Sequence, residues 1–191
     1  NCYDTITFMR EIEIKLPAPN LEETISRLKE LGCVLSEPIT QEDINFIHKD
    51  DVKWFESNGE GWVYPRLRLQ NNKSPTFTIK KPMTNEMDCL EYEMHVDNVN
   101  NLRGMMELFD YKEGVTVKKN RRTCKYGDYE ITVDEVEKLG NFVEIEQVVV
   151  DGDASKIQDE MFRFAKDKLN LEKDNAVMKG YDILLHYFLN K

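Results

Sequence analysis

Acidic and basic residues alternate with apolar residues along several short segments of this chain. The first is Glu11-Ile12-Glu13-Ile14-Lys15, near the amino end. A period of two is typical of a β-strand, and on a strand Glu11, Glu13 and Lys15 would share one face while the isoleucines share the other. Taken alone, the segment fits an ordinary strand with its charges in water equally well.

The same alternation recurs along most of the chain, so several predicted strands have one apolar and one charged face. Arginine and lysine gather on some of these strands, and Glu-x-Glu pairs on others. The charged faces together carry Glu11, Glu13, Glu91, Glu93, Asp134, Glu144, Glu146, Lys15, Arg66, Arg68, Lys80, Lys119 and Arg121. Clustered bases suit phosphate oxygens, and clustered carboxylates suit Mg²⁺ or Mn²⁺. The set therefore indicates a site for a metal–triphosphate complex.

A structural ladder of ion pairs is the alternative interpretation of the same charges. Charges enclosed by protein must pair with each other, stay hydrated or be held for a ligand. The residue types alone leave both interpretations open. Other chemistry lacks support, because the chain has no GxxxxGK[ST], GxGxxG, GxSxG or HExxH motif. Its histidines, His48, His95 and His186, are isolated in sequence and are expected to be structural.

The elements that would position these charges form a strand-rich α+β pattern. Strands are expected over 9–16, within 33–48, and over 63–70, 75–81, 88–97, 114–125, 129–136 and 142–149. Helices are expected after an Asn20 N-cap, over 98–109 and over 153–169, with a last apolar segment over 180–189 that is helical and packed outside the sheet.

Closure of the sheet follows from where the helices can pack. Their apolar stripes need the apolar sheet face, which places that face outward and the charged face inward. A closed barrel of about eight strands encloses room for side chains or one small ligand. Residues 49–62 read as a polar loop, in which Trp54 and Trp62 could border a base-binding mouth, although burial under the loop is the favoured expectation.

Composition limits the class of protein. The net charge of −10 leaves no basic surplus for nucleic acid or an anionic membrane. The four cysteines form no CxxC pair, and no signal-peptide or transmembrane run is present, so we expect a cytoplasmic protein with free thiols. One domain over 9–191 is expected, with residues 1–8 as an extension or expression remnant ahead of Met9.

An ordered set of motifs resembles the CYTH domain, or triphosphate tunnel metalloenzyme, family. The opening ExExK segment resembles the family signature. The matching segments are Glu11–Lys15, Arg66-Leu-Arg68, Thr78-Ile-Lys80-Lys-Pro, Glu91-Tyr-Glu93, Val117-Lys-Lys119-Asn-Arg121, Ile131-Thr-Val-Asp134, Leu139-Gly-Asn-Phe-Val-Glu144-Ile-Glu146 and Lys179-Gly-Tyr-Asp-Ile-Leu-Leu185. The resemblance runs from about Met9 to the end of the chain.

The resemblance implies an eight-stranded antiparallel tunnel with helices outside, together with a division of roles. Metal (Mg²⁺ or Mn²⁺) would be held by Glu11, Glu13 and Glu144, helped by Glu146 and Asp134. The triphosphate would be bound by Lys15, Arg66, Arg68, Lys80, Lys119 and Arg121. Catalysis would rest on Lys15, Arg68, Lys80 and Asp134, whereas Glu91 and Glu93 would form a second metal site or orient the bases.

A class IV (CyaB-like) adenylate cyclase is the leading expectation within this family. The alternatives are a triphosphatase acting on inorganic, thiamine or nucleoside triphosphate, and a non-catalytic triphosphate or cyclic-nucleotide binder. CyaB-like relatives also imply a homodimer.

One feature departs from the cyclase pattern: some cyclases carry His-Phe ahead of the ExExK strand, and this chain has Thr7-Phe8. For the site itself, Glu13→Ala and Arg68→Ala are each expected to abolish activity with the fold retained.

Overall fold

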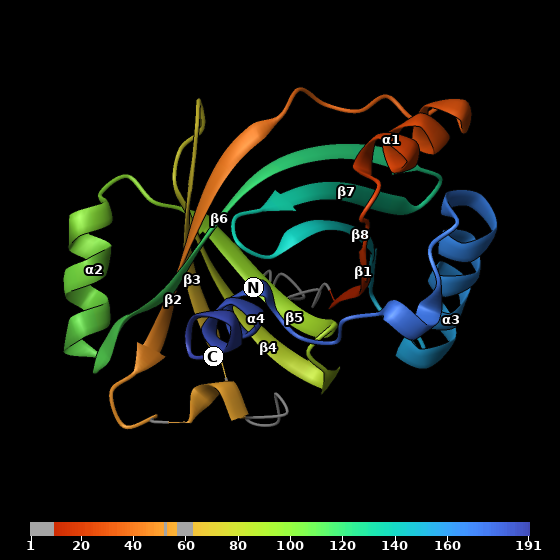
Figure 1. Cartoon of the computed structure of the whole chain (residues 1–191). Coiled ribbons are helices and arrows are strands. Elements are labelled where there is room, and N and C mark those ends of the chain that lie inside the picture. The colour runs from red at the N-terminus through yellow and green to blue at the C-terminus, as the bar shows by residue number, and fades with distance from the viewer. Residues whose placement is uncertain (1–9, 52, 57–62) are drawn as a thin grey trace, which may run out of the picture.

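Strand β1 (Arg10–Pro17) pairs antiparallel with a partner on each side and closes the sheet into a barrel. The computed structural model describes residues 10–51, 53–56 and 63–191. The strand order is β1-β5-β4-β3-β2-β6-β7-β8 (Figure 1). The remaining strands are β2 (Ile39–His48), β3 (Tyr64–Gln70), β4 (Thr76–Asn85), β5 (Asp88–His95), β6 (Tyr111–Tyr126), β7 (Tyr129–Val136) and β8 (Gly140–Val149). The predicted closed antiparallel barrel is confirmed.

Three of the α-helices in the described part of the chain begin where the sequence supplies a side-chain cap. In α1 (Leu21–Glu30), the Asn20 side chain accepts a hydrogen bond from the backbone N–H of Glu23 at 3.2 Å. Asn98 and Asp153 cap α2 (Val99–Leu108) and α3 (Ala154–Phe164) in the same way. These caps satisfy backbone donors that have no partner within the helix. The other elements are η1 (Trp54–Glu56), the π-helical turn η2 (Ala165–Leu169), η3 (Lys173–Asn175) and α4 (Tyr181–Leu189).

The hydrophobic core lies mainly between the outer face of the barrel and the helices. Ile14 and Ile145 are fully buried in a cluster beneath α1 and α3. A second cluster, which includes Leu67 and Phe77, lies beneath α2 on the opposite side of the barrel (Figure 1). Because the apolar face points outward into these clusters, the alternate residues of the same strands point into the lumen.

Helix α4 lies elsewhere than expected for the 180–189 segment. It does not cover the outer wall but lies over one end of the barrel. Its Tyr181 and Leu185 form a buried cluster with Val117, Val136 and Phe142, which share the inward face of their strands with the lumen charges. The barrel can accept a helix here because these three inward residues are apolar, unlike their neighbours further along the strands. α4 thus seals one end of the lumen.

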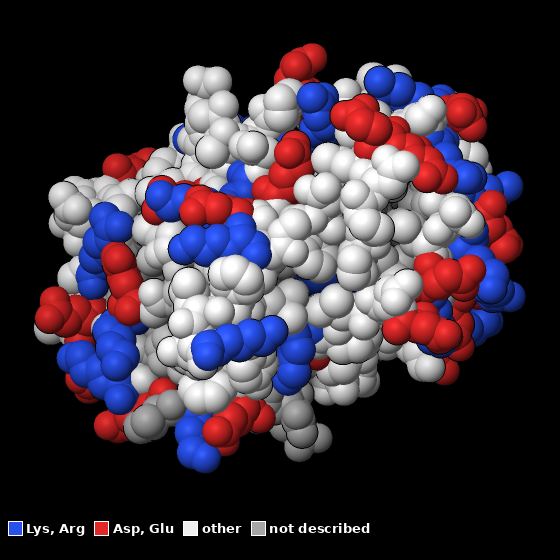
Figure 2. Space-filling view, viewed as in Figure 1, with Lys and Arg blue, Asp and Glu red and all other residues white. Residues whose placement is uncertain are grey.

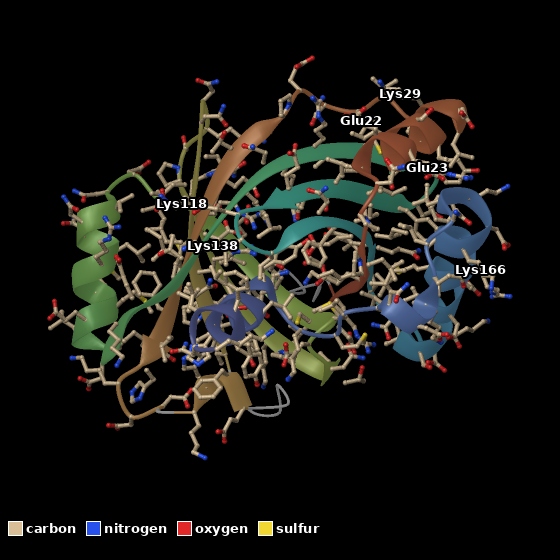
Figure 3. All side chains as sticks on the ribbon, in the orientation of Figure 1. Glu22, Glu23, Lys29, Lys118, Lys138 and Lys166 are labelled. Atoms are coloured by element: carbon tan, nitrogen blue, oxygen red, sulfur yellow. The ribbon has the colours of Figure 1, made fainter. Side chains whose placement is uncertain are left out.

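The alternation of faces is clearest on β6. Lys118 points outward and its side chain is 56% exposed, whereas the side chain of Lys119 is 3% exposed inside the barrel. Figure 3 labels Lys118 together with Glu22, Glu23 and Lys29 of α1, all of them outside the lumen. On the face in Figure 2, acidic and basic residues are intermixed around an uncharged centre. Of the helices in the described part of the chain, none is long and apolar enough to cross a membrane.

Candidate active site

The lumen holds a cavity of about 240 Å³ whose wall is dominated by charged side chains. The predicted site residues that border it are Glu11, Glu13, Lys15, Arg66, Arg68, Lys80, Glu91, Glu93, Lys119, Arg121, Glu144 and Glu146. Asp134 is the exception. It is fully buried behind Arg121 and does not border the cavity. Apart from Asp134, the predicted set converges on one space.

Asp43 anchors two of the bases. Arg68 donates to it through two hydrogen bonds, from Nε at 2.6 Å and from Nη2 at 2.8 Å, and Lys119 Nζ lies 3.5 Å away. Burial alone would raise the pKa of Asp43, but the charges of Arg68 and Lys119 outweigh burial and hold that pKa well below its usual value. The carboxylate is therefore ionised and fixes the direction of the Arg68 guanidinium.

Arg121 is held between two acids. Its Nε donates to Asp134 at 2.7 Å, and its Nη2 contacts both Asp134 and Glu144. Lys15 Nζ lies 3.3 Å from the other oxygen of Glu144. Burial and the charge of Arg121 lower the pKa of Lys119 to about 8. Because several bases lie close together, Lys119 loses its proton easily. A bound phosphate would favour the protonated form of Lys119.

Lys80 links the glutamates of two neighbouring strands. Its Nζ lies 3.0 Å from Glu11 and 2.5 Å from Glu91. Arg66 lies 3.5 Å from Glu91 as well, and the Thr78 hydroxyl donates to Glu93 at 3.1 Å. Burial raises the pKa of Glu11 to about 8, helped by its contact with Glu91. Glu91 thus contacts two bases and Glu93 a hydroxyl, and the choice between a second metal site and a base-orienting role for them stays a prediction.

A row of three carboxylates is not balanced by bases. Glu13 pairs in register with Glu146, which pairs with Glu130. None of the three forms an ion pair within the described part of the chain. Burial and the nearby charge of Glu13 raise the pKa of Glu146 to about 7. A row of half-buried carboxylates is the donor chemistry that suits a hard divalent cation.

The ligand set for a metal stays a prediction. Among the residues that the structure describes, no three His, Cys, Asp or Glu side chains are close enough together to hold an ion. Glu144 and Asp134 contact Arg121, and Glu11 contacts Lys80. The carboxylates present fit a divalent cation by type, and Glu13 and Glu146 are the members of the predicted set that are free to turn toward one.

Several lumen residues were missed in the sequence. Asp43 lies on the inward face of β2 with Gln41 and Asn45. The alternation of these three polar residues along the strand could have revealed Asp43 as a lumen residue. Glu86 and Asp182 lie outside the alternating strand segments, so alternation could not reveal them. Tyr181 is also new: Lys15 Nζ lies 4.3 Å and Lys119 Nζ 5.0 Å from the centre of its ring. These contacts connect α4 to two bases of the lumen.

Comparison with known proteins agrees with this geometry. The family model described as "CYTH domain" matches residues 9–181. A protein of Methanocaldococcus jannaschii named "Putative adenylate cyclase" is 30% identical over 179 residues, covering 91% of this chain and 97% of its own.

Two solved structures share the fold. A protein of Vibrio parahaemolyticus described as a "putative adenylate cyclase" has a TM-score of 0.76 at 17% identity, with 95% of this chain and 98% of its own covered. A Hippeastrum protein described as a "putative adenylyl cyclase" that "reveals a dominant triphophatase activity" has a TM-score of 0.61 at 15% identity, with 96% of each chain covered.

Fold and lumen together define a closed β-barrel with a charged interior, the architecture of the triphosphate tunnel proteins. The chain belongs to the CYTH domain family.

Proposed function

We propose that this chain is a metal-dependent enzyme acting on a triphosphate in its lumen, and specifically a class IV adenylate cyclase that converts ATP to 3′,5′-cyclic AMP and pyrophosphate. The observation that carries the proposal is the convergence of Lys15, Arg68, Lys119 and Arg121 on a cavity that also contains the unbalanced row of Glu13, Glu146 and Glu130. If the charges formed only a structural ladder of ion pairs, each carboxylate of that row would be expected to pair with a base.

The basic side chains would bind the phosphate oxygens. Arg68 and Arg121 are already oriented by Asp43 and Asp134, so they lose little side-chain freedom on binding. Lys15 of β1 and Lys80 of β4, two strands away in the barrel, would contribute point charges. Asp134 would act by holding Arg121, since it does not border the cavity.

A divalent cation, held by Glu13 and Glu146 with help from Glu11 and Glu144, would neutralise phosphate charge and stabilise the pyrophosphate leaving group. The protein's own part is then positioning and charge stabilisation around the α-phosphate. The conversion is balanced: the ribose 3′-oxygen bonds to the α-phosphorus, the bond to pyrophosphate breaks, and the hydroxyl proton is released.

A triphosphatase is the second candidate. The same charges would bind an inorganic or thiamine triphosphate, and the Hippeastrum protein of the same fold is described as having dominant triphosphatase activity. In that case water, rather than the ribose hydroxyl, would attack the terminal phosphorus. A non-catalytic binder is less favoured, since a binder has no need for the carboxylate row.

A product assay separates these candidates. The purified protein is incubated with Mg²⁺ or Mn²⁺ and, in separate reactions, with ATP, thiamine triphosphate and inorganic triphosphate. Cyclic AMP and pyrophosphate from ATP are the expected products. Orthophosphate without cyclic AMP would contradict the cyclase and support the triphosphatase, and tight binding without turnover of any substrate would support the binder.

A further inference from the structure

Residues 177–180, which lead into α4, run beside β1 at Lys15, and we call them the α4 approach. The backbone N–H of Val177 donates to the carbonyl oxygen of Lys15 at 2.9 Å. The side chain of Lys15 makes a second contact, since its Nζ donates to the carbonyl oxygen of Lys179 at 3.1 Å. Lys15 Nζ also lies 3.3 Å from Glu144. The ammonium group of Lys15 is therefore held both by a carboxylate of the barrel and by a carbonyl of the α4 approach.

Glu86, in the turn between β4 and β5, fixes the end of the α4 approach. One oxygen of its carboxylate accepts from Lys179 Nζ at 2.8 Å, and the other accepts from the backbone N–H of Gly180 at 3.3 Å. Gly180 is the N-cap residue of α4 and has no side chain with which to cap the helix. Glu86 thus satisfies the N-cap N–H from a distant turn, as the glutamate of a capping box does from within a helix.

The two contacts at Gly180 and Lys179 meet at one peptide group. The N–H of Gly180 and the carbonyl of Lys179 belong to the same planar unit, in which they point in opposite directions. A carboxylate that accepts from the N–H therefore aims the carbonyl at Lys15. It also polarises the peptide, which strengthens the hydrogen bond that the carbonyl accepts from the ammonium group.

The turn that carries Glu86 is itself attached to β1. The backbone N–H of Glu13 donates to the carbonyl oxygen of Met87 at 2.8 Å. Gln158 of α3 donates through Nε2 to the carbonyl oxygens of Glu13 and Met87, at 3.1 and 3.4 Å. Because these contacts do not involve the α4 approach, the turn offers Glu86 an independent support from which to hold the peptide.

The charge of Glu86 would by itself have the opposite effect on a triphosphate. Glu86 borders the lumen cavity, where a negative charge repels phosphate. If charge were its main contribution, removing Glu86 would tighten triphosphate binding. If its main contribution is to orient the peptide, removing it would weaken binding. The sign of the change therefore distinguishes the two roles.

We infer that Glu86 is a positioning residue of the triphosphate site, which orients the peptide between Lys179 and Gly180 so that its carbonyl holds the ammonium group of Lys15 at the lumen. This inference rests on the proposed function and deepens it, because it adds to the phosphate-binding side chains a residue that acts through one of them.

A double-mutant cycle tests the inference. Calorimetry measures the binding of ATP and, separately, of inorganic triphosphate, each with Mg²⁺. We expect Glu86→Ala to weaken binding about tenfold, the effect of losing one hydrogen bond to a charged group. In a Lys15→Met background the same substitution should change affinity less than about twofold, because its effect passes through Lys15. A merely structural role would give the same loss in both backgrounds.

Labelling of Lys15 tests its position without a ligand. Acetic anhydride reacts with accessible amines, and the Lys15 side chain is 3% exposed. We expect Glu86→Ala, in conditions where circular dichroism shows it folded, to raise the acetylation rate of Lys15 at least about threefold and to leave that of exposed Lys118 unchanged. Mass spectrometry of the peptides measures both rates.

Two further variants complete the design. Glu86→Gln keeps an oxygen acceptor for Gly180 and covers the case in which Glu86→Ala does not fold; it should bind triphosphate about threefold more weakly than the natural protein, whereas loss of a repelling charge would tighten binding. Glu172→Ala is the matched control. It removes a glutamate that pairs with Lys166 at 3.1 Å outside the lumen, and it should change neither binding nor labelling.

The outcomes separate the two proposals. Tighter or unchanged binding in the Glu86 variants, an equal loss in the Lys15→Met background, or unchanged labelling of Lys15 would overturn the inference and leave the proposed function standing. Failure of the natural protein to bind any triphosphate would overturn the proposed function, and the labelling of Lys15 would still show whether Glu86 orients it.

Discussion

A charged side chain in the lumen can both face the cavity, where a ligand would bind, and neutralise a neighbouring side chain. Arg68 shows both, because its guanidinium faces the cavity and also satisfies the buried carboxylate of Asp43. The effect of a substitution therefore depends on which partner is left behind. This changes one expectation from the sequence, which treated Arg68 as removable from a hydrated lumen without cost to the fold.

Arg68→Ala should now lose stability as well as triphosphate binding. Removing the base leaves Asp43 buried with Lys119, at 3.5 Å, as its remaining ion-pair partner among the described residues. We expect a loss of about 3 kcal/mol in the free energy of unfolding, measured with urea. The double variant Asp43→Asn/Arg68→Ala should recover much of that stability and still not bind triphosphate. Equal stability of the single variant and the natural protein would show that Asp43 is solvated.

Glu146 should make the metal-free protein sensitive to pH. Its pKa rises from 4.5 to about 7 in the folded protein, so the folded state holds the proton more tightly than the unfolded chain. The stability due to this group is full below about pH 4.5 and is lost as the pH rises to about 7. Thermal unfolding in EDTA should show this fall, Glu146→Gln should reduce it, and Mg²⁺ should oppose it. A fall of the same size in Glu146→Gln would assign it to other groups, Glu11 among them.

At the scale of elements, α4 is the part whose position decides most about the site. It closes one end of the lumen through Leu185 and brings Tyr181 against Lys15 and Lys119. It also carries Asp182 to the wall of the lumen cavity. The docking of this helix, rather than its helicity, should matter for binding.

Leu185→Asp tests that docking. A carboxylate in the buried apolar cluster with Val117 and Phe142 would lose its hydration, so we expect a loss of about 3 kcal/mol or more in stability together with weaker triphosphate binding. Leu189→Asp is the control, since Leu189 lies on the same helix and is 53% exposed. Urea unfolding and calorimetry measure the two effects. Similar behaviour of the two variants would mean that α4 contributes little to closing the end of the lumen.

At the scale of the whole molecule, stability comes from apolar clusters outside the barrel and function from charges inside it. Ile14 and Lys15 are neighbours in sequence, yet the first is buried beneath the helices and the second faces the lumen. Strand pairing keeps these two environments apart.

Ile14→Ala should therefore reduce stability without touching the lumen. Loss of a fully buried isoleucine side chain costs about 2–5 kcal/mol. Val148→Ala, at an exposed position on β8, should change stability by less than about 0.5 kcal/mol. Urea unfolding measures both, and triphosphate affinity at a temperature where Ile14→Ala is folded should match that of the natural protein.

Much of this architecture could be predicted from alternation, because a strand with one charged and one apolar face has a defined inside once helices cover the apolar face. Most of the charged side chains that line the lumen followed from alternation, whereas Glu86, Tyr181 and Asp182 did not. Alternation could not provide the pairing of side chains. The contact of Asp43 with Arg68, and that of Asp134 with Arg121, depend on the register between neighbouring strands. The position of α4 over the end of the lumen was missed for a different reason. The apolar residues of α4 fit the outside and the end of a barrel equally well.

The register of β1 also sets the order in which the site can form. β1 is the first strand of the chain, but one of its two partners is β8, and Lys15 lies opposite Glu144. During synthesis, β1 leaves the ribosome early with Glu11, Glu13 and Lys15. It cannot pair with β8 until most of the chain has been made. Pairing across so long a separation closes a large loop and is slow. The cluster beneath α2 could form before β8 is made, whereas the cluster beneath α1 and α3 includes Ile145 of β8 and could not. A chain that stops short of β8 would lack Glu144 and Glu146, and its lumen would stay open on one side.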